Sequence, residues 1–303
     1  MRYRSLGRTG VQVSSLGLGT NQFGRVVDEA GAKAIIDRAQ EIGLNFIDSA
    51  ESYGPDGKSE MLLGKALSGR RDAFVLATKT GAGSDPGRQT RRRITQRLDA
   101  SLQRLATDYI DLYYLHFPDA ATPLEESLRA LEDATRAGKI RYAALSNHPA
   151  WQVAEAVGLA DRHGWQPIAA SQMEYSLVER AVERETLPAC AHLGVSFVPY
   201  FPLAGGFLTG KYQKDVAPPP NTRFGRAQQR PRYLTDDNFT KLEKWKAFAS
   251  DQGHDMNELA IAWLLAHPVV SSVIAGATAP DQLTANAKAT DWSLTAEDLA
   301  AIP

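Results

Sequence analysis

The sequence predicts an α/β protein whose eight parallel strands and crossover helices close into a (β/α)8 TIM barrel, with an N-terminal β-hairpin and extra helices near the C-terminus. Short apolar runs rich in β-branched residues alternate with longer amphipathic segments, which is the order found in a parallel sheet. Polar side chains able to exchange protons follow three of these runs, where barrels of this type carry their chemistry. A length of 303 residues suits one such barrel, so a single domain over residues 1–303 is expected.

The predicted strands recur along the whole chain, and their number suggests a closed barrel. They are expected at residues 16–19, 45–48, 75–79, 110–116, 140–146, 168–172, 196–200 and 272–275. In a segment between two of them, Ile94, Leu98 and Leu102 recur at helical spacing, so one apolar stripe can pack on the barrel wall. Asp28, Thr122 with Pro123, and Thr290 are expected to begin helices, whereas Gly43, Gly138, Gly164 and Gly194 are expected to end them.

Two segments depart from this rhythm. Near the N-terminus, Tyr3 and Val11 to Val13 flank Gly7 and Gly10, which predicts a short hairpin that covers the N-terminal end of the barrel. Residues 203–237 form one long irregular stretch with paired glycines, three successive prolines and several arginines. Loops of that length are usually functional lids or disordered segments. Helices are expected to resume at residues 239–249 and 257–266.

Composition excludes several classes of partner. The 34 Lys and Arg residues nearly balance 35 Asp and Glu residues, so no overall attraction to nucleic acid or to a membrane surface is expected. Cys190 is the only cysteine, which rules out an intramolecular disulfide and suits a reducing compartment. Without a signal peptide or a long apolar run, the protein is expected to be cytoplasmic. No uncovered apolar stripe indicates an oligomeric state.

The residues Asp48, Tyr53, Lys79 and His116 lie at or just beyond the ends of predicted strands two, three and four. Together they suit an acid whose pKa is lowered, because a nearby ammonium group favours a phenolate. Tyr53 is the predicted proton donor, Lys79 the positive charge and Asp48 its partner. Each has a simpler alternative: Asp48 as a helix cap or loop hydrogen-bonder, Lys79 and Tyr53 as surface residues, and His116 as a structural imidazole.

No metal is required for this chemistry. The six histidines never form a His-x3-His pair or a spacing of two histidines with one carboxylate. An arginine run, comprising Arg88, Arg91, Arg92, Arg93 and Arg97, is interpreted as a solvated helix face opposite the apolar stripe, with an anion-binding patch as the alternative.

At this point the chain resembles the aldo-keto reductase superfamily, as a bacterial-type member related to the branch of channel β-subunits. The resemblance spans nearly the whole chain and rests on Gly17-Leu18-Gly19-Thr20, residues 45–50 with Tyr53-Gly54, residues 108–116, and Ser146-Asn147. It implies that Asp48, Tyr53, Lys79 and His116 form a catalytic tetrad. In that family the tyrosine protonates a carbonyl oxygen while reduced nicotinamide delivers hydride to the carbon.

The resemblance also implies how a dinucleotide binds, since no G-x-G-x-x-G follows the first strand. The family resemblance makes NADP(H) the expected cofactor. NAD(H) stays possible, because Ala277-Thr278-Ala279 offers no basic side chain for a 2′-phosphate. Tyr200 is expected to stack on the nicotinamide and Lys211 to neutralise the pyrophosphate. The full implied set is Gly19, Thr20, Asn21, Asp48, Ser146, Asn147, Gln172, Tyr200, Phe201, Leu203, Gly205, Lys211, Gly276, Gln282 and Asn286.

The expected function is therefore reversible reduction of an aldehyde or ketone by NAD(P)H, with a small-molecule carbonyl or alcohol as substrate. Phe23, Phe117, Trp151 and Phe201 are expected to line an apolar pocket above the nicotinamide. Sugar, steroid, toxin and simple aldehyde substrates all stay open. Two rivals remain: a regulatory subunit that binds cofactor with little turnover, and an aldolase-like enzyme in which Lys79 forms a Schiff base.

Overall fold

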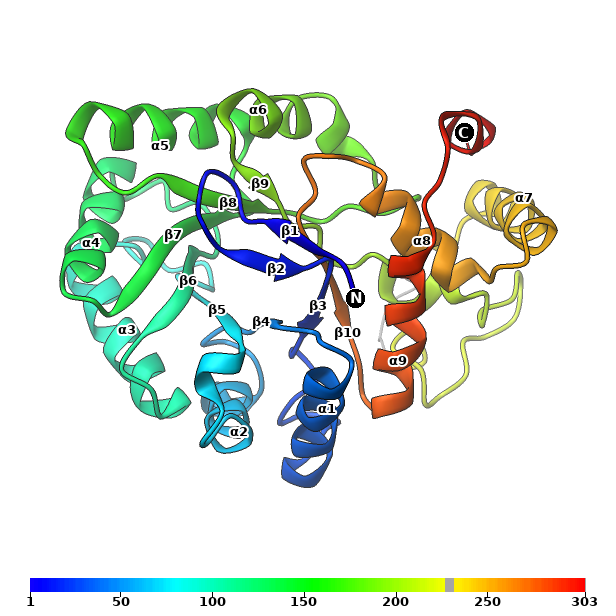
Figure 1. The fold of residues 1–303 in the computed structure, drawn as a ribbon, viewed down its shortest axis with the longest axis horizontal. Coiled ribbons are helices and arrows are strands. Elements are labelled where there is room, and N and C mark those ends of the chain that lie inside the picture. Colours follow the sequence, from blue (N-terminus) through cyan, green and yellow to red (C-terminus); the bar gives the residue numbers. More distant parts are fainter. Residues whose placement is uncertain (227–231, 303) are drawn as a thin grey trace.

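The computed structural model describes residues 1–226 and 232–302, and within them the eight parallel strands of the predicted barrel are present. The strands curl around a common centre with helices outside them (Figure 1). They are β3 (Leu16–Gly19), β4 (Phe46–Asp48), β5 (Val75–Thr80), β6 (Ile110–Leu115), β7 (Ile140–Ser146), β8 (Ile168–Gln172), β9 (Ser196–Phe197) and β10 (Val273–Gly276). Parallel bridges from Phe197 to Val270 and from Tyr200 to Ile274 close the ring between β9 and β10. The predicted (β/α)8 fold class is confirmed.

One predicted strand is shorter than expected. The sequence predicts a strand over residues 196–200, but β9 contains only Ser196 and Phe197. Pro199 has no N–H group with which to continue the ladder, so the chain keeps only isolated bonds to its neighbours. The Tyr200 N–H donates to Met173 O, and Ile274 N–H donates to Pro199 O. These bonds still place Tyr200 at the same barrel rim.

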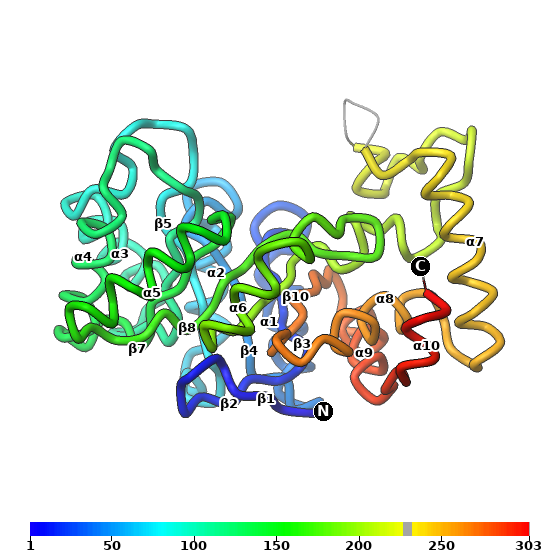
Figure 2. The backbone as a smooth tube through the Cα atoms, turned by 90° about the horizontal axis from the view of Figure 1, so that it is seen from above, coloured from blue at the N-terminus to red at the C-terminus, as the bar shows by residue number. Residues whose placement is uncertain are grey.

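Helices surround the strands. The crossover helices are α1 (Glu29–Glu41), α2 (Lys58–Ala66), α3 (Arg91–Leu105), α4 (Leu124–Arg136), α5 (Ala150–His163), α6 (Thr186–Leu193), α8 (Met256–Leu265) and α9 (Pro280–Lys288), with α7 (Asp236–Asp251) and α10 (Ala296–Ala301) as the extra helices. Short 3-10 turns lie at η1 (Pro55–Gly57), η2 (Arg71–Ala73), η3 (Ala181–Glu183), η4 (Ala204–Thr209) and η5 (Ala289–Asp291). The outlying α7 lies at the edge of the molecule beyond α8 (Figure 2).

Most predicted helix ends are observed. The Asp28 carboxylate caps α1 by accepting from Gly31 N–H, and Gly164 and Gly194 end α5 and α6 with positive φ angles. Thr290 was expected to begin a helix, and this prediction is wrong. It lies inside the 3-10 turn η5, and its hydroxyl donates back to Ala287 O in the last turn of α9, so the chain is still leaving α9 at this residue. The cap of the last helix is Thr295, five residues later.

The N-terminal hairpin closes the barrel from below. Strands β1 (Tyr3–Ser5) and β2 (Gln12–Ser14) pair antiparallel and lie across one end of the barrel (Figures 1 and 2). Leu6 and Val13 are fully buried and pack in one cluster with the inward side chains Phe46, Leu112 and Val198. The structure therefore agrees with the predicted hairpin cover, which leaves the opposite rim of the barrel uncovered by it.

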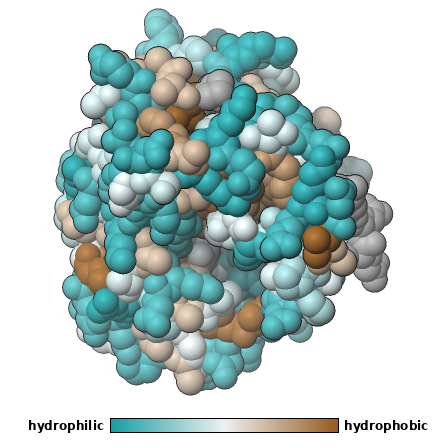
Figure 3. All heavy atoms as spheres, turned by 90° about the vertical axis from the view of Figure 1, so that its right-hand side faces the viewer, coloured by the Kyte–Doolittle hydropathy of each residue, from teal (hydrophilic) through white to brown (hydrophobic). Residues whose placement is uncertain are grey.

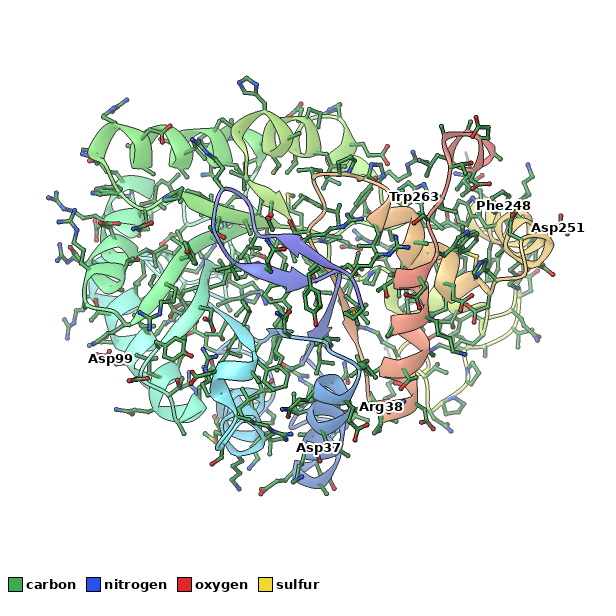
Figure 4. The ribbon with its side chains drawn as sticks, in the orientation of Figure 1. Asp37, Arg38, Asp99, Phe248, Asp251 and Trp263 are labelled. Atoms are coloured by element: carbon green, nitrogen blue, oxygen red, sulfur yellow. The ribbon has the colours of Figure 1, made fainter. Side chains whose placement is uncertain are left out.

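The outer surface is largely charged. The face drawn in Figure 3 is mostly hydrophilic, with hydrophobic residues scattered over it. Asp37 on α1 and Asp99 on α3 project outward (Figure 4) and pair with Arg70 and Lys139 at 2.6 Å each. Among the described residues, no helix combines the length and apolar character needed to cross a membrane.

Candidate active site

The four predicted catalytic residues meet at one rim of the barrel. Asp48 is the last residue of β4, Lys79 the penultimate residue of β5, and His116 follows β6 directly. Tyr53 lies in the loop between β4 and η1. Because parallel strands all end at the same side, residues far apart in the chain share this rim.

A buried ion pair anchors the site. The Lys79 ammonium donates to Asp48 Oδ1 at 2.5 Å and to Ser49 O at 2.7 Å. Gln172 Nε2 donates to the other Asp48 oxygen at 2.9 Å, so the carboxylate is held from two sides. Burial lowers the pKa of Lys79, but the Asp48 carboxylate and Tyr53 together raise it by more, so the net shift of the pKa is upward. Lys79 is therefore an ammonium at neutral pH.

Tyr53 is only partly buried and lies beside this ammonium. The Lys79 nitrogen is 5.2 Å from the centroid of the Tyr53 ring. The sequence predicts a lowered phenol pKa, and the direction is wrong: burial raises the pKa of Tyr53 by more than the Lys79 charge lowers it. The phenol is thus protonated at neutral pH, as a proton donor must be.

His116 is a neutral imidazole at this rim. Burial and the Lys79 charge together lower the pKa of His116 to about 3. Its ring makes an edge contact with Tyr53 at a centroid distance of 6.1 Å and stacks on Phe117 at 4.7 Å. Among the described residues, His116 Nδ1 has no hydrogen-bond partner although it is buried. Buried polar atoms rarely stay unpaired, so this nitrogen lacks a partner that the described side chains do not supply.

A polar network continues along the rim from His116. Asn147, with a φ of 62°, donates from its amide to His116 O at 2.9 Å and to Ser146 Oγ at 3.1 Å. The Tyr200 hydroxyl donates to the Asn147 amide oxygen at 2.9 Å. The structure therefore brings together four residues that the resemblance assigns to the nicotinamide end, namely Ser146, Asn147, Gln172 and Tyr200.

A groove of about 880 Å³ lies between the loops that follow β3, β9 and β10. The predicted cofactor residues that line it are Asn21, Phe201, Leu203, Gly205, Lys211, Gly276, Gln282 and Asn286. Its volume, and the fact that its lining comes from several separate loops, suit a large ligand. Gln282 accepts from Thr278 N–H at 2.8 Å and so shapes the turn that precedes α9.

Two adjacent glycines that line the groove have backbone conformations that other residues rarely adopt. Gly205 and Gly206 have φ angles of 67° and 94°. A Cβ at Gly205 would lie 2.7 Å from the Phe224 ring, and one at Gly206 would lie 2.7 Å from Lys211 Nζ. The ammonium of Lys211 therefore folds directly over the backbone of this turn.

The groove is more basic than the sequence predicts. Arg25, Arg223 and Arg226 line it together with Lys211, against one carboxylate, Asp255. An excess of cations attracts an anionic ligand such as a dinucleotide. Arg223 lies 4.3 Å above the Phe201 ring, and its charge acts to lower the pKa of Tyr53. The sequence analysis assigned none of these three arginines to the cofactor site, because the two loops that carry them have no periodic pattern that would place them.

Some predicted contacts are not observed. Phe23 was expected in the substrate pocket, but its side chain is fully buried in the barrel-helix core, so that prediction is wrong. The Thr20 side chain is also fully buried; its hydroxyl donates to Asp48 O and accepts from Ser59, so it is closed to a ligand. Phe117 and Trp151 are 39% and 64% exposed, and Phe201 lines the groove.

This combination of barrel, rim and groove agrees with a known family. The family model described as "Aldo/keto reductase family" matches residues 15–303. The chain belongs to the aldo/keto reductase family. The tetrad residues and every residue of the groove fall inside the matched range.

Several known proteins resemble this chain over most of their length. A "Probable voltage-gated potassium channel subunit beta" of Arabidopsis thaliana is 39% identical over 302 residues, covering 96% of this chain and 92% of that protein. "Uncharacterized oxidoreductase YrpG" of Bacillus subtilis (strain 168) is 38% identical over 313 residues, covering 99% and 94%. "L-glyceraldehyde 3-phosphate reductase" of Escherichia coli (strain K12) is 32% identical over 306 residues, covering 95% and 87%.

Family membership and the oxidoreductase relatives support an oxidoreductase that uses a nicotinamide cofactor. The groove fits such a group, because its volume is about 880 Å³, polar and cationic side chains line it, and its lining includes Phe201, the residue after Tyr200 at the rim. At the Gly205-Gly206 turn the Lys211 ammonium lies over the backbone, and a positive charge at such a turn suits a phosphate group.

Proposed function

We propose that this protein reduces an aldehyde or ketone to an alcohol, reversibly, with NAD(P)H as the reductant. The observation that carries the proposal is the buried Lys79–Asp48 pair beside a protonated Tyr53 and a neutral His116. An acid, a fixed positive charge and a neutral hydrogen-bonding ring are what protonation of a carbonyl oxygen needs.

Each rim residue has one role in this proposal. Tyr53 donates its proton to the carbonyl oxygen, and the Lys79 ammonium stabilises the phenolate that is left. Asp48 keeps Lys79 charged and in place, since a buried ammonium without a partner would lose its proton. The neutral imidazole of His116 orients the carbonyl through a hydrogen bond. When bound, the reduced nicotinamide supplies the hydride that the carbonyl carbon receives.

The groove is the proposed cofactor site. Lys211 and the arginines of the groove offer charge to the phosphates, and we assign Ser146, Asn147 and Gln172, which lie at the rim, to the nicotinamide end. We place NADP(H) ahead of NAD(H) on family grounds. The turn after β10 contributes Thr278 and Gln282 but no basic side chain, so the preference for the 2′-phosphate is expected to be small.

The protonation state of Lys79 weakens the aldolase alternative. A Schiff base requires a neutral amine, whereas Asp48 and Tyr53 hold the pKa of Lys79 above its usual value. Borohydride should therefore trap no substrate adduct on Lys79.

A regulatory role is the second candidate, because relatives 39% identical to this chain are named as channel β-subunits. A subunit of that kind would bind the cofactor but turn over slowly. The intact tetrad favours the enzyme. A cytoplasmic location is proposed for either role, on the basis of the balanced charge and the single buried cysteine.

The test is a calorimetric titration with NADPH and NADH side by side, followed by a screen of carbonyl substrates with the tighter cofactor. The panel should include L-glyceraldehyde 3-phosphate, named by a relative, together with sugar, steroid and simple aldehydes. Binding followed by cofactor oxidation supports the proposal. Tight binding with no turnover on any carbonyl would favour the regulatory subunit, and no binding of either cofactor would reject both.

A further inference from the structure

Two glutamates, Glu60 fully buried and Glu51 mostly buried, lie behind Lys79 on the opposite face of β5. Thr78 donates to Glu60 Oε1 at 2.6 Å, and Thr80 donates to Glu51 Oε1 at 3.3 Å. Successive side chains of a strand point to opposite faces, so these threonines face outward while Lys79 faces the site. Each flanking residue of the catalytic lysine is therefore tied to a carboxylate.

Both glutamates are paired with arginines of α3. Arg97 lies 3.0 Å from Glu51, and Arg104 lies 2.7 Å from Glu60. The arginines are seven residues apart and so share one face of the helix. Arg97 was interpreted as part of a solvated face, and for this residue the interpretation is wrong, because its guanidinium reaches back to the loop beside the site.

Glu51 connects the loop that carries Tyr53 to the end of β5, the strand that carries Lys79. It belongs to the short loop between Asp48 and Tyr53, and its backbone N–H donates to Lys79 O at 3.2 Å. Its carboxylate accepts from Gly81 N–H at 2.9 Å, just after β5. The Glu51 side chain is 12% exposed, so little water competes for these bonds.

From these contacts we infer that Glu51 is a positioning residue, which fixes the Tyr53 loop against the end of β5 so that the phenol stays beside the Lys79 ammonium. The inference rests on the proposed function for its effect on catalysis. Its physical basis is that displacement of a reacting group by about 1 Å can cost about 100-fold in rate. Arg97 supports the same contact from α3.

The test compares Glu51→Ala and Glu51→Gln with a matched control elsewhere in the barrel. Glu132 on α4 is similarly buried, pairs with Arg136 at 2.8 Å and accepts from Gln166 N–H at 3.1 Å, but it lies outside the rim and groove. Glu132→Ala therefore removes an equivalent carboxylate without touching the site. Steady-state kinetics and amide hydrogen exchange are measured for all three variants and the parent protein.

Glu51→Ala is expected to lower kcat by about 10- to 100-fold while leaving KM for the cofactor within about twofold. Glu51→Gln keeps an acceptor for Gly81 N–H and is expected to recover most of kcat. Exchange should accelerate over residues 49–57 and 79–83 in Glu51→Ala. Glu132→Ala should change neither kcat nor exchange in these two segments.

The inference is overturned if Glu51→Ala keeps the parental kcat and exchange, or if its losses match those of Glu132→Ala. If the parent protein reduces no carbonyl, the proposed function fails, whereas the exchange comparison still decides the role of Glu51. Should Glu51→Ala not fold, Arg97→Ala changes a half-exposed side chain and applies the same exchange test, with unchanged exchange over residues 49–57 counting against the inference.

Discussion

The two sides of the barrel mouth are built differently. On the side of β4, β5 and β6, the proposed catalytic residues lie at strand ends or in the short loop after β4, beside ion pairs such as Lys79 with Asp48 and Arg104 with Glu60. On the side of β9 and β10, the groove is lined by loop residues, exposed cations and two glycines with positive φ. Catalysis needs fixed charges, whereas a long ligand needs a surface shaped by loops.

The loop after β6 also belongs to the side of β4, β5 and β6, where side chains are held by hydrogen bonds and ion pairs. The loop after β6, which carries Phe117, is tied to the loop after β5 by Asp119, whose carboxylate accepts from Gln89 N–H at 3.0 Å and from Thr122 at 2.8 Å. The His116–Phe117 stack is thereby held from below. The difference between the two sides implies that mutations on the strand side change turnover, and those on the loop side change ligand affinity.

Tyr53→Phe should have the largest effect on catalysis. Removal of the hydroxyl deletes the proton donor, so kcat should fall by about 100- to 10,000-fold. Cofactor affinity should stay near that of the parent, because the groove does not include Tyr53. Stopped-flow kinetics and calorimetry measure the two quantities, and full residual turnover would remove Tyr53 from its role.

Lys79→Met should lower the stability of the protein and so test whether the β4–β6 side of the barrel mouth depends on its buried ion pair. It leaves the buried Asp48 carboxylate without its partner, which costs about 3–5 kcal/mol in the free energy of unfolding. The double variant Lys79→Met with Asp48→Asn should be more stable than Lys79→Met alone, because no charge is left unpaired. Urea titrations of the single and double variants measure this coupling; strictly additive losses would argue against a tight pair.

Gly206→Ala should affect the other side of the mouth. The new Cβ meets Lys211 Nζ, so cofactor should bind about tenfold more weakly while kcat at saturation is kept. Gly69→Ala is the control, because Gly69 also has a positive φ but has open space around it. Both variants should lose about 1 kcal/mol of stability. Equal cofactor affinity in the two variants would show that Lys211 does not contact the ligand.

The last prediction concerns the pH dependence of stability. The pKa of His116 is about 3 in the folded chain, below the ordinary value of 6.5, so the unfolded chain binds a proton first as pH falls. Stability should therefore decrease between about pH 6.5 and pH 3 and level off below that range. His116→Gln should reduce this slope by about 1 kcal/mol per pH unit. Chemical denaturation at several pH values provides the measurement, and an unchanged slope would place the His116 pKa near 6.5.

The sequence predicted the strands well, and it predicted which residues share the rim. The local pattern of apolar residues predicts the alternation of strands and helices, and parallel strands place their carboxyl ends together. The placement of Asp48, Lys79 and His116 therefore required no knowledge of distant contacts. The exceptions were local conflicts, such as Pro199 shortening β9 and Thr290 donating its hydroxyl within a turn.

What the sequence by itself determined was thus the barrel and the order of acid–base groups around its mouth, since both follow from short-range patterns. Tertiary structure alone decided the rest: the burial of Phe23, the link from Arg97 to Glu51, the arginines of the groove and the upward direction of the Tyr53 pKa. Each of these depends on burial and on charges from residues far away in the chain. A local sequence pattern does not predict how exposed a side chain is to solvent, or which charges lie beside it, in the folded protein.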